Sequence, residues 1–131
     1  MALPIERLPR MLVVDDEERI GHVLSKHFSS RGYEVRSARR GDEALALTNV
    51  FPPDIVLLDL LMPGMNGIET LKALKQLNPS PKVIMLSAAD HDEVIKGALQ
   101  LGADFYIPKP INLSQLERLV HGCCPAAKPI N

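Results

Sequence analysis

The sequence predicts an α/β fold in which a parallel sheet lies between two layers of helices. Short apolar runs alternate with amphipathic segments along the chain, and such folds have this order of strands and helices. Three of the runs, at residues 12–14, 55–58 and 83–86, are continuously apolar, as expected for parallel strands that are buried on both faces. Capping residues, glycines and prolines separate the segments. We therefore expect five strand–helix units.

The predicted strand comes first in each unit. The five strands are expected at residues 11–14, 33–38, 54–60, 82–87 and 104–107. In three of the segments between or after them, apolar side chains recur at helical spacing and form one face. These side chains are Ile20, Val23, Leu24 and Phe28, then Val94, Ile95, Ala98 and Leu99, and finally Leu113, Leu116, Leu119 and Val120. Each helix is expected to bury this face against the sheet.

The helix boundaries are marked by residues that suit helix ends. Asn66, Asp90 and Asn112 each precede a Glu or Gln by three residues, in the manner of a capping box. Gly32 and Gly102 stand where the C-terminus of a helix favours a left-handed residue. All 11 prolines are expected in tails or connections, because proline breaks the interior of a helix.

Length and charge limit the classes of function. A chain of 131 residues fits one domain. The net charge of −1 provides no electrostatic reason to expect direct binding of nucleic acid or of an anionic membrane. No apolar run approaches the roughly 20 residues of a membrane-spanning helix, and the first residues lack the pattern of a signal peptide, so a cytoplasmic location is expected. Cys123 and Cys124 are expected to be reduced thiols in a C-terminal tail.

Polar residues terminate several of the predicted strands. Asp15 and Asp16 follow the first strand, Asp59 lies at the end of the third, Ser87 ends the fourth and Lys109 follows the fifth. Ligands of open parallel sheets bind at the carboxyl ends of the strands, so these side chains are expected at one edge. Taken singly, each has an ordinary explanation, as a helix cap, a turn residue or a surface lysine. Their shared position favours a site.

Asp59 is the hardest of these residues to explain as structural. It interrupts a run of buried-strand residues, where an unpaired charge is costly. Asp54 lies on the same predicted strand but about 16 Å away, at the opposite end, and is not expected to join the cluster.

The predicted cluster suits phosphoryl transfer. Three carboxylates repel one another, and a small hard cation such as Mg²⁺, or Mn²⁺ in its place, relieves that repulsion. With the metal bound, the Asp59 carboxylate can act as a nucleophile toward phosphorus and form an aspartyl phosphate. The Lys109 ammonium and the Ser87 hydroxyl would then neutralise and hold the phosphoryl oxygens.

The sequence resembles the receiver domain of bacterial response regulators. The likeness rests on Val13-Val14-Asp15-Asp16-Glu17, on Asp59-Leu60-Leu61-Met62-Pro63-Gly64-Met65-Asn66-Gly67, on Leu86-Ser87-Ala88, on Gly102-Ala103-Asp104-Phe105-Tyr106 and on Lys109-Pro110. It implies a flavodoxin-like, doubly wound (βα)5 sandwich with strand order 2-1-3-4-5. The domain would span residues 11–122, with a tail at residues 1–10 and a tail or the start of a linker at residues 123–131.

The resemblance also implies roles for the site residues. Asp15 and Asp16 would hold Mg²⁺ together with Asp59 and the backbone carbonyl of Leu61. Asp59 would take the phosphoryl group from a phosphohistidine on a sensor histidine kinase or a histidine phosphotransfer protein. Apart from this transfer and a slow autodephosphorylation, the domain would be a signalling module and not an enzyme.

Further implications of the resemblance concern the surroundings of the phosphate. Ala88 would be the small residue beside the phosphate, and the peptide bond before Pro110 would be cis, which aims the preceding lysine inward. Ser87 and Tyr106 would be a switch pair that changes the face of the fourth helix, fifth strand and fifth helix. That face would control an output domain or a protein partner. A plain core role for Tyr106 is the alternative.

Two residues depart from the family pattern. Pro108 creates Pro-Lys-Pro and is expected to stiffen a loop there, and Phe105 replaces an acid that many winged-helix regulators use at their dimer face.

Other readings of the sequence remain. A dehalogenase-type phosphatase would need Asp-x-Asp after the first strand, and a nucleotide-binding module would need a glycine-rich loop there; neither pattern is present. A phosphorylation-independent interaction domain of the same fold is the third alternative. The chain could act as a stand-alone receiver or be part of a longer regulator or hybrid kinase.

Overall fold

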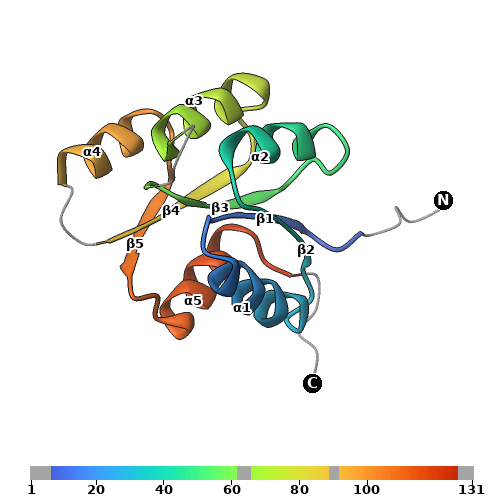
Figure 1. The fold of residues 1–131 in the computed structure, drawn as a ribbon. Coiled ribbons are helices and arrows are strands. Elements are labelled where there is room, and N and C mark those ends of the chain that lie inside the picture. Colours follow the sequence, from blue (N-terminus) through green and yellow to red (C-terminus); the bar gives the residue numbers. More distant parts are fainter. Residues whose placement is uncertain (1–6, 62–65, 89–91, 127–131) are drawn as a thin grey trace.

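The computed structural model describes residues 7–61, 66–88 and 92–126, and its sheet lies between two layers of helices (Figure 1). The strands are β1 (Arg10–Val14), β2 (Glu34–Ala38), β3 (Ile55–Asp59), β4 (Lys82–Ala88) and β5 (Phe105–Lys109). The helices are α1 (Glu18–Ser29), α2 (Gly41–Thr48), α3 (Gly67–Leu77), α4 (Asp92–Gln100) and α5 (Leu113–Cys123). All strands are parallel in the order β2-β1-β3-β4-β5, so the predicted fold and topology are confirmed.

The pleat of the sheet divides the core into two layers. Met11 and Val13 of β1 face α1 and α5, whereas Leu12 and Val14 face α2, α3 and α4. Residues of β3 and β4 alternate in the same way, because successive side chains of a strand point to opposite faces. Each fully buried aliphatic side chain contributes about 1.5–3 kcal/mol relative to an exposed one. Burial on both faces explains why the central strands are continuously apolar.

The predicted helix signals hold wherever the structure describes them. The Asn66 side chain accepts the Glu69 N–H at 2.9 Å, and that of Asn112 accepts the Gln115 N–H at 3.0 Å. Gly32 and Gly102 have φ values of 94° and 110°, in the left-handed region. The predicted cap at Asp90 lies outside the described residues.

A close approach of backbones joins the end of β3 to α3. A Cβ atom added at Gly67, the first residue of α3, would lie 2.4 Å from the carbonyl oxygen of Asp59 and from Cα of Leu60. Only glycine permits this contact, which places the start of α3 directly against the end of β3.

Two residues of the predicted apolar faces are exposed. Val23 is 44% exposed and Leu99 is 43% exposed. The buried stripes are narrower than predicted: Leu24 and Phe28 of α1, and Ile95 and Ala98 of α4, are the buried members of the predicted faces. Val23 and Leu99 are each next in sequence to a buried residue. Their side chains therefore point about 100° away from that residue around the helix axis.

The placement of Pro108 and of the two cysteines also differs from prediction. Pro108 lies within β5 and not in a connection, and β5 is an edge strand, where proline is tolerated. Cys123 is the last residue of α5, and Cys124 caps it. Both thiols are free and continue the apolar stripe of α5 against the core. No helix in the described ranges is long and apolar enough to cross a membrane.

Candidate functional site

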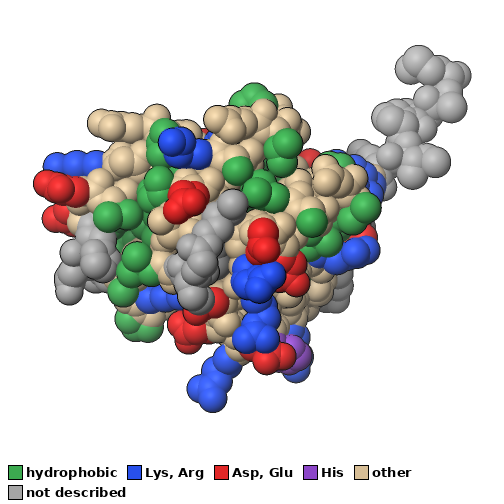
Figure 2. All heavy atoms as spheres, turned by 45° about the horizontal axis from the view of Figure 1, so that its top comes forward, with side chains coloured by type: hydrophobic (Ala, Val, Ile, Leu, Met, Phe, Trp, Pro, Cys, Tyr) green, Lys and Arg blue, Asp and Glu red, His purple; other side chains and the backbone are tan. Residues whose placement is uncertain are grey.

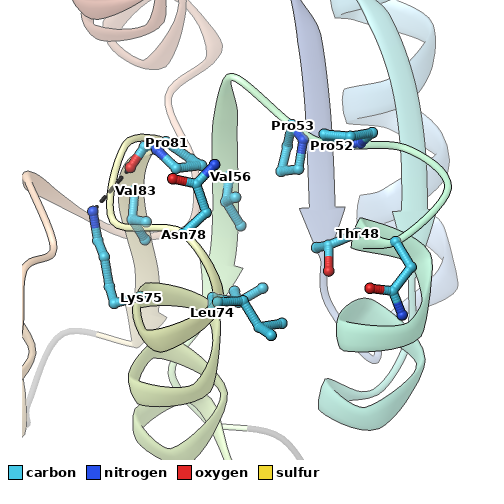
Figure 3. Close-up of a pocket in the computed structure, with 11 residues that line it drawn as sticks. Thr48, Pro52, Pro53, Val56, Leu74, Lys75, Asn78, Pro81 and Val83 are labelled. Carbon is cyan, nitrogen blue, oxygen red and sulfur yellow. Dashed lines mark hydrogen bonds between the residues drawn. The ribbon is translucent and has the colours of Figure 1, made fainter.

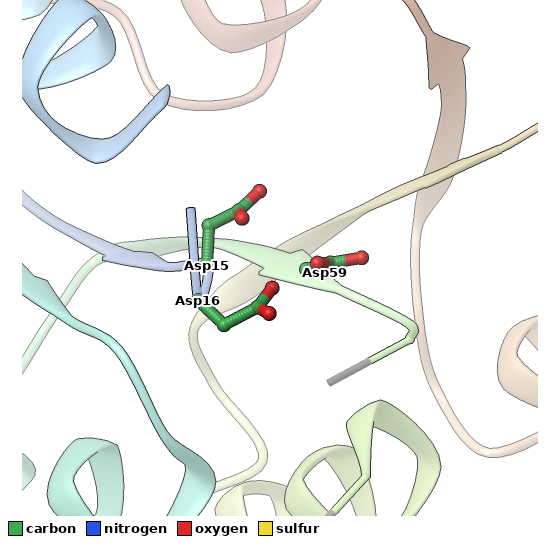
Figure 4. Close-up of side chains that lie close together, drawn as sticks. All are labelled: Asp15, Asp16 and Asp59. Atoms are coloured by element: carbon green, nitrogen blue, oxygen red, sulfur yellow. The ribbon is translucent and has the colours of Figure 1, made fainter. Parts of the chain in front are cut away.

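Three carboxylates meet at the carboxyl edge of the sheet. Asp15 and Asp16 directly follow β1, and Asp59 is the last residue of β3. One oxygen from each lies within 4.8 Å of the others. Figure 4 shows the three side chains at the ends of the two neighbouring strands. The predicted acidic cluster is therefore present in the fold.

Asp59 is buried and contacted by two groups. It is only 3% exposed. Its Oδ1 accepts the Leu61 N–H at 3.1 Å, and its Oδ2 lies 3.3 Å from Nζ of Lys109. Burial raises its pKa to about 6, and repulsion by Asp15 adds to the effect, while the Leu61 N–H and Lys109 oppose it. The site holds this carboxylate in an environment that disfavours its charge.

Asp15 and Asp59 share the ammonium of Lys109, the last residue of β5. Oδ1 of Asp15 accepts the Glu17 N–H at 2.9 Å. Oδ2 of Asp15 is buried and receives no hydrogen bond from the residues described, although Nζ of Lys109 lies 3.0 Å away. Burial alone would lower the pKa of Lys109, but the two carboxylates outweigh burial and raise it. The single ammonium of Lys109 therefore pairs with both Asp15 and Asp59.

The donor set fits a small divalent cation. Three carboxylates converge, and one of them, Asp15, has a buried oxygen without a hydrogen bond in the described parts of the chain. Mg²⁺ prefers oxygen ligands and binds through one or two carboxylates together with a phosphate oxygen and water. A cation here would relieve the repulsion that Lys109 alone leaves uncompensated.

Ser87 and Tyr106 lie on the neighbouring strands β4 and β5 and face the same layer of helices. Ser87 is fully buried on β4, and its hydroxyl donates to the Ala88 carbonyl at 3.0 Å. By strand alternation it faces α2, α3 and α4, and Tyr106 packs against the core on the same face. Asp59 and Lys109 have the alternation of the α1 and α5 face. Within the described residues, no hydrogen bond joins Ser87 to Asp59.

Three further predicted residues lie near the carboxyl ends of the strands. Leu61 is 46% exposed, and its backbone N–H donates to Oδ1 of Asp59. Ala88 ends β4 and is exposed. The peptide bond between Lys109 and Pro110 is cis, as predicted.

Two arginines at the same edge were missed by the sequence analysis. Arg39 and Arg40 follow β2, whose last residue, Ala38, accepts the Asp15 N–H at 3.1 Å. Both arginines line an open hollow of about 450 Å³ together with Asp16 and Glu43. A signal was available, because the strand-end rule that finds the acids also finds these residues when it is applied to the second strand.

A second cavity lies at the opposite end of the strands. It measures about 160 Å³ and is lined by the C-terminal ends of α2 and α3 and by the amino ends of β3 and β4 (Figure 3). Val56, Leu74 and Val83 form apolar parts of its wall. It contains none of the predicted site residues, so the chemistry of the carboxyl edge does not extend to it.

Asp54 also lies at that far end, immediately before β3. It accepts two hydrogen bonds from the Arg7 guanidinium, at 2.9 and 3.2 Å, and the Arg10 backbone N–H at 2.8 Å. The prediction that Asp54 stands apart from the cluster is confirmed by these contacts.

Comparison with known proteins points to one family. A family model described as the response regulator receiver domain matches residues 11–121. Sporulation initiation phosphotransferase F of Bacillus subtilis is 34% identical over 116 residues, which cover 88% of this chain and 94% of that protein. The transcriptional regulatory protein CpxR of Escherichia coli is 42% identical over 109 residues, which cover 82% of this chain and 45% of CpxR.

The structural comparison agrees. The chemotaxis protein CheY4 of Vibrio cholerae superposes with a TM-score of 0.83 at 29% identity, covering 88% of this chain and 98% of that chain. The chain spans about a quarter to a half of the length of several curated relatives that it matches.

Proposed function

The chain belongs to the response regulator receiver domain family, and from that premise we propose that Asp59 accepts a phosphoryl group from a phosphohistidine. The donor would be a sensor histidine kinase or a histidine phosphotransfer protein. The observation that carries the proposal is the position of Asp59, which is buried at the end of β3 between two further acids and Lys109. Membership of the receiver family favours this function over a dehalogenase-type phosphatase.

The proposed reaction is a direct displacement at phosphorus. One carboxylate oxygen of Asp59 forms a bond to phosphorus while the bond from phosphorus to the donor nitrogen breaks. The electron pair of that bond stays on the leaving imidazole. The product is an aspartyl phosphate, and water later cleaves it to carboxylate and inorganic phosphate. The transition state carries its charge on the equatorial oxygens, so the protein acts mainly by positioning groups and neutralising charge.

Asp15, Asp16 and Asp59, with the backbone carbonyl of Leu61, are the proposed ligands of Mg²⁺ or Mn²⁺. The bound cation would neutralise charge on the carboxylates and on one phosphoryl oxygen. Lys109 already lies 3.3 Å from Asp59 and would neutralise a second oxygen. The proposal for Ser87 is that its hydroxyl leaves the Ala88 carbonyl and donates to a third, with room left by the small Ala88 side chain.

The position of two residues on one face of the sheet supports the proposed switch. Ser87 and Tyr106 both face the layer of α2, α3 and α4, and Tyr106 is only partly buried there. Movement of the Ser87 hydroxyl toward the phosphate would open space for the Tyr106 ring. The face of α4, β5 and α5 would then change shape and control an output domain or a protein partner, as a cytoplasmic signalling module.

A mass measurement tests the phosphoacceptor. After incubation with acetyl phosphate and Mg²⁺, the wild-type chain should gain one phosphoryl group, and chelation of the metal should prevent the gain. Asp59→Asn should not gain mass. Asp54→Asn is the matched control on the same segment and should gain mass as the wild type does. An unmodified wild-type chain under these conditions would favour the phosphorylation-independent interaction domain.

A second measurement tests the switch. In Tyr106→Ala, phosphorylation should proceed while the chemical-shift changes that it causes in α4 and α5 of the wild type should be lost. Unaltered changes in the variant would leave Tyr106 as a plain core residue.

A further inference from the structure

The carboxyl edge of the sheet carries two exposed arginines at β2, beside acids, and the proposed function does not use them. Arg39 and Arg40 follow β2 directly after Ala38. Ala38 pairs in register with the last residue of β1. The two arginines therefore leave β2 at the level at which Asp15 and Asp16 leave β1. Acids and arginines stand side by side at neighbouring strand ends.

The arginines and the acidic cluster share a surface. Asp16, Arg39, Arg40 and Glu43 line one open hollow of about 450 Å³. Asp16 also belongs to the cluster in which one oxygen from each carboxylate, including Asp59, lies within 4.8 Å of the others. The hollow is thus continuous with the cluster through Asp16. Figure 2 shows acidic and basic side chains next to each other on the face that it presents.

Both guanidiniums are available to an incoming anion. The side chains of Arg39 and Arg40 are 64% and 67% exposed. Arg39 lies 4.0 Å from a carboxylate oxygen of Glu18, and Arg40 lies 3.1 Å from one of Asp42. Exposed ion pairs of this kind contribute little to stability, so neither is held firmly by its present partner.

The acids around Asp59 oppose the approach of an anionic phosphodonor, and nearby cationic groups would offset this repulsion. Asp15, Asp59 and Glu17 surround the single ammonium of Lys109, and Asp16 adds a further acid. With the proposed divalent cation bound, these four acids still exceed the charges of the metal and of Lys109 by one, so they oppose the approach of a phosphoryl group with a charge of roughly −2. Cationic groups at the rim of a cleft raise the local concentration of an anionic substrate and its rate of association.

We propose that Arg39 and Arg40 form a cationic approach to the Asp59 site that attracts the phosphoryl dianion of the phosphodonor. This inference rests on the proposed function and deepens it. The two arginines act through the electrostatic field on the donor and are positioning residues, because they do not touch the reacting atoms. The ligand class is a phosphorylated donor with a charge of about −2.

The test compares phosphorylation rates with acetyl phosphate as the probe, in the presence of Mg²⁺. In the double variant R39Q/R40Q, the second-order rate constant should fall about fivefold at low ionic strength. The rate at saturating donor should stay at the wild-type value. The difference should vanish near 1 M salt, where the screening length is about 3 Å. R39K/R40K keeps both charges and should restore most of the wild-type rate.

Arg31 and Arg118 provide a matched control, because they line a separate hollow between the end of α1 and α5. R31Q/R118Q changes the net charge equally and should retain both the wild-type rate and its salt dependence. Equal rates and equal salt dependence in R39Q/R40Q and the wild type would overturn the proposal. A loss that persists at high salt, or that lysine does not restore, would overturn it in favour of a structural role. A wild-type chain that gains no phosphoryl group would instead refute the proposed function.

Discussion

The two ends of β3 each carry an aspartate, and the two carboxylates have opposite environments. Asp54, just before the strand, accepts hydrogen bonds from the Arg7 guanidinium and the Arg10 N–H. Burial alone would raise its pKa, but these donors outweigh burial and lower it. Asp59, at the other end, is more deeply buried beside a second acid, and its pKa is raised to about 6.

The difference shows what separates a structural acid from a reactive one. Asp54 accepts hydrogen bonds from Arg7 and Arg10, and among the described residues the Arg7 guanidinium forms an ion pair only with Asp54. The charge of Asp54 therefore stabilises the folded state. Asp59 shares Lys109 with Asp15 and Glu17, and its charge is only partly compensated. A divalent cation would therefore stabilise the charged form of Asp59. The two acids lie at opposite ends of one strand, and the positive charge available to each decides whether it is structural or reactive.

The largest effect is expected at the shared cation. Lys109→Ala should lower the rate of Asp59 phosphorylation by acetyl phosphate about 100-fold or more, because a preorganised charge that faces the transition state is lost. Lys82 at the amino edge, 3.9 Å from Asp104, provides the control. Lys82→Ala should leave the rate unchanged. Rates are followed by intact mass, and similar rates in both variants would contradict the proposed role of Lys109.

The next largest effect concerns the backbone that holds Asp59 in place. In Gly67→Ala, the new Cβ would lie 2.4 Å from the Asp59 carbonyl oxygen. Overpacking of this kind should lower the free energy of unfolding by about 3 kcal/mol. Gly97 has no heavy atom within 4 Å of an added Cβ, and Gly97→Ala should stabilise α4 by up to about 1 kcal/mol. Urea denaturation measures both changes, and equal stability of the two variants would refute the close approach.

The opposite pKa shifts predict opposite dependences of stability on pH. The folded-state pKa of Asp59, about 6, lies above the ordinary value of 3.8, so the folded state binds the proton more tightly. Its contribution to stability is present below pH 3.8 and is lost as the pH rises through 6. Without metal, Asp59→Asn should therefore be about 1–3 kcal/mol more stable than the wild type at pH 7.5, with the gain disappearing near pH 4. Urea denaturation in EDTA across this range checks the slope, and Mg²⁺ should remove the gain.

The smallest effect is expected at Asp54. Its pKa is lowered, so its contribution is present above the ordinary value of 3.8 and is lost as the pH falls further. Because the side chain is 37% exposed, screening limits the effect, and Asp54→Asn should cost only about 0.5–1 kcal/mol at pH 7. The cost should vanish in acid, and addition of Mg²⁺ should not alter it. Thermal denaturation at pH 7 and pH 3 compares the two states.

Much of the site follows from counting residues along strands. The continuous apolar run at residues 55–58 and the acid that ends it locate Asp59 at the carboxyl edge, and the same count places Asp54 at the other end. Arg39 and Arg40 were equally open to this rule. They were missed because only the other four strands were followed to their ends.

Other features depend on contacts between distant segments. The placement of Ser87 and Tyr106 on one face, and of Asp59 on the other, depends on the pleat and register of three strands. The inclusion of Pro108 in β5 depends on β5 being an edge strand. The narrow buried stripes of α1 and α4 leave Val23 and Leu99 exposed, although their spacing is helical. Periodicity indicates a face but does not fix its width.

By itself, the sequence determined the alternation of strands and helices, the edge at which the acids gather and the identity of the proposed phosphoacceptor. These features are local, because apolar runs, caps and strand ends are properties of neighbouring residues. Only the tertiary structure decided how the charges at that edge are shared. Lys109 meets Asp59 across 50 residues, and Arg7 meets Asp54 across 47. A pKa depends on burial and on such distant partners, so the contrast between the two ends of β3 arises only in the folded chain.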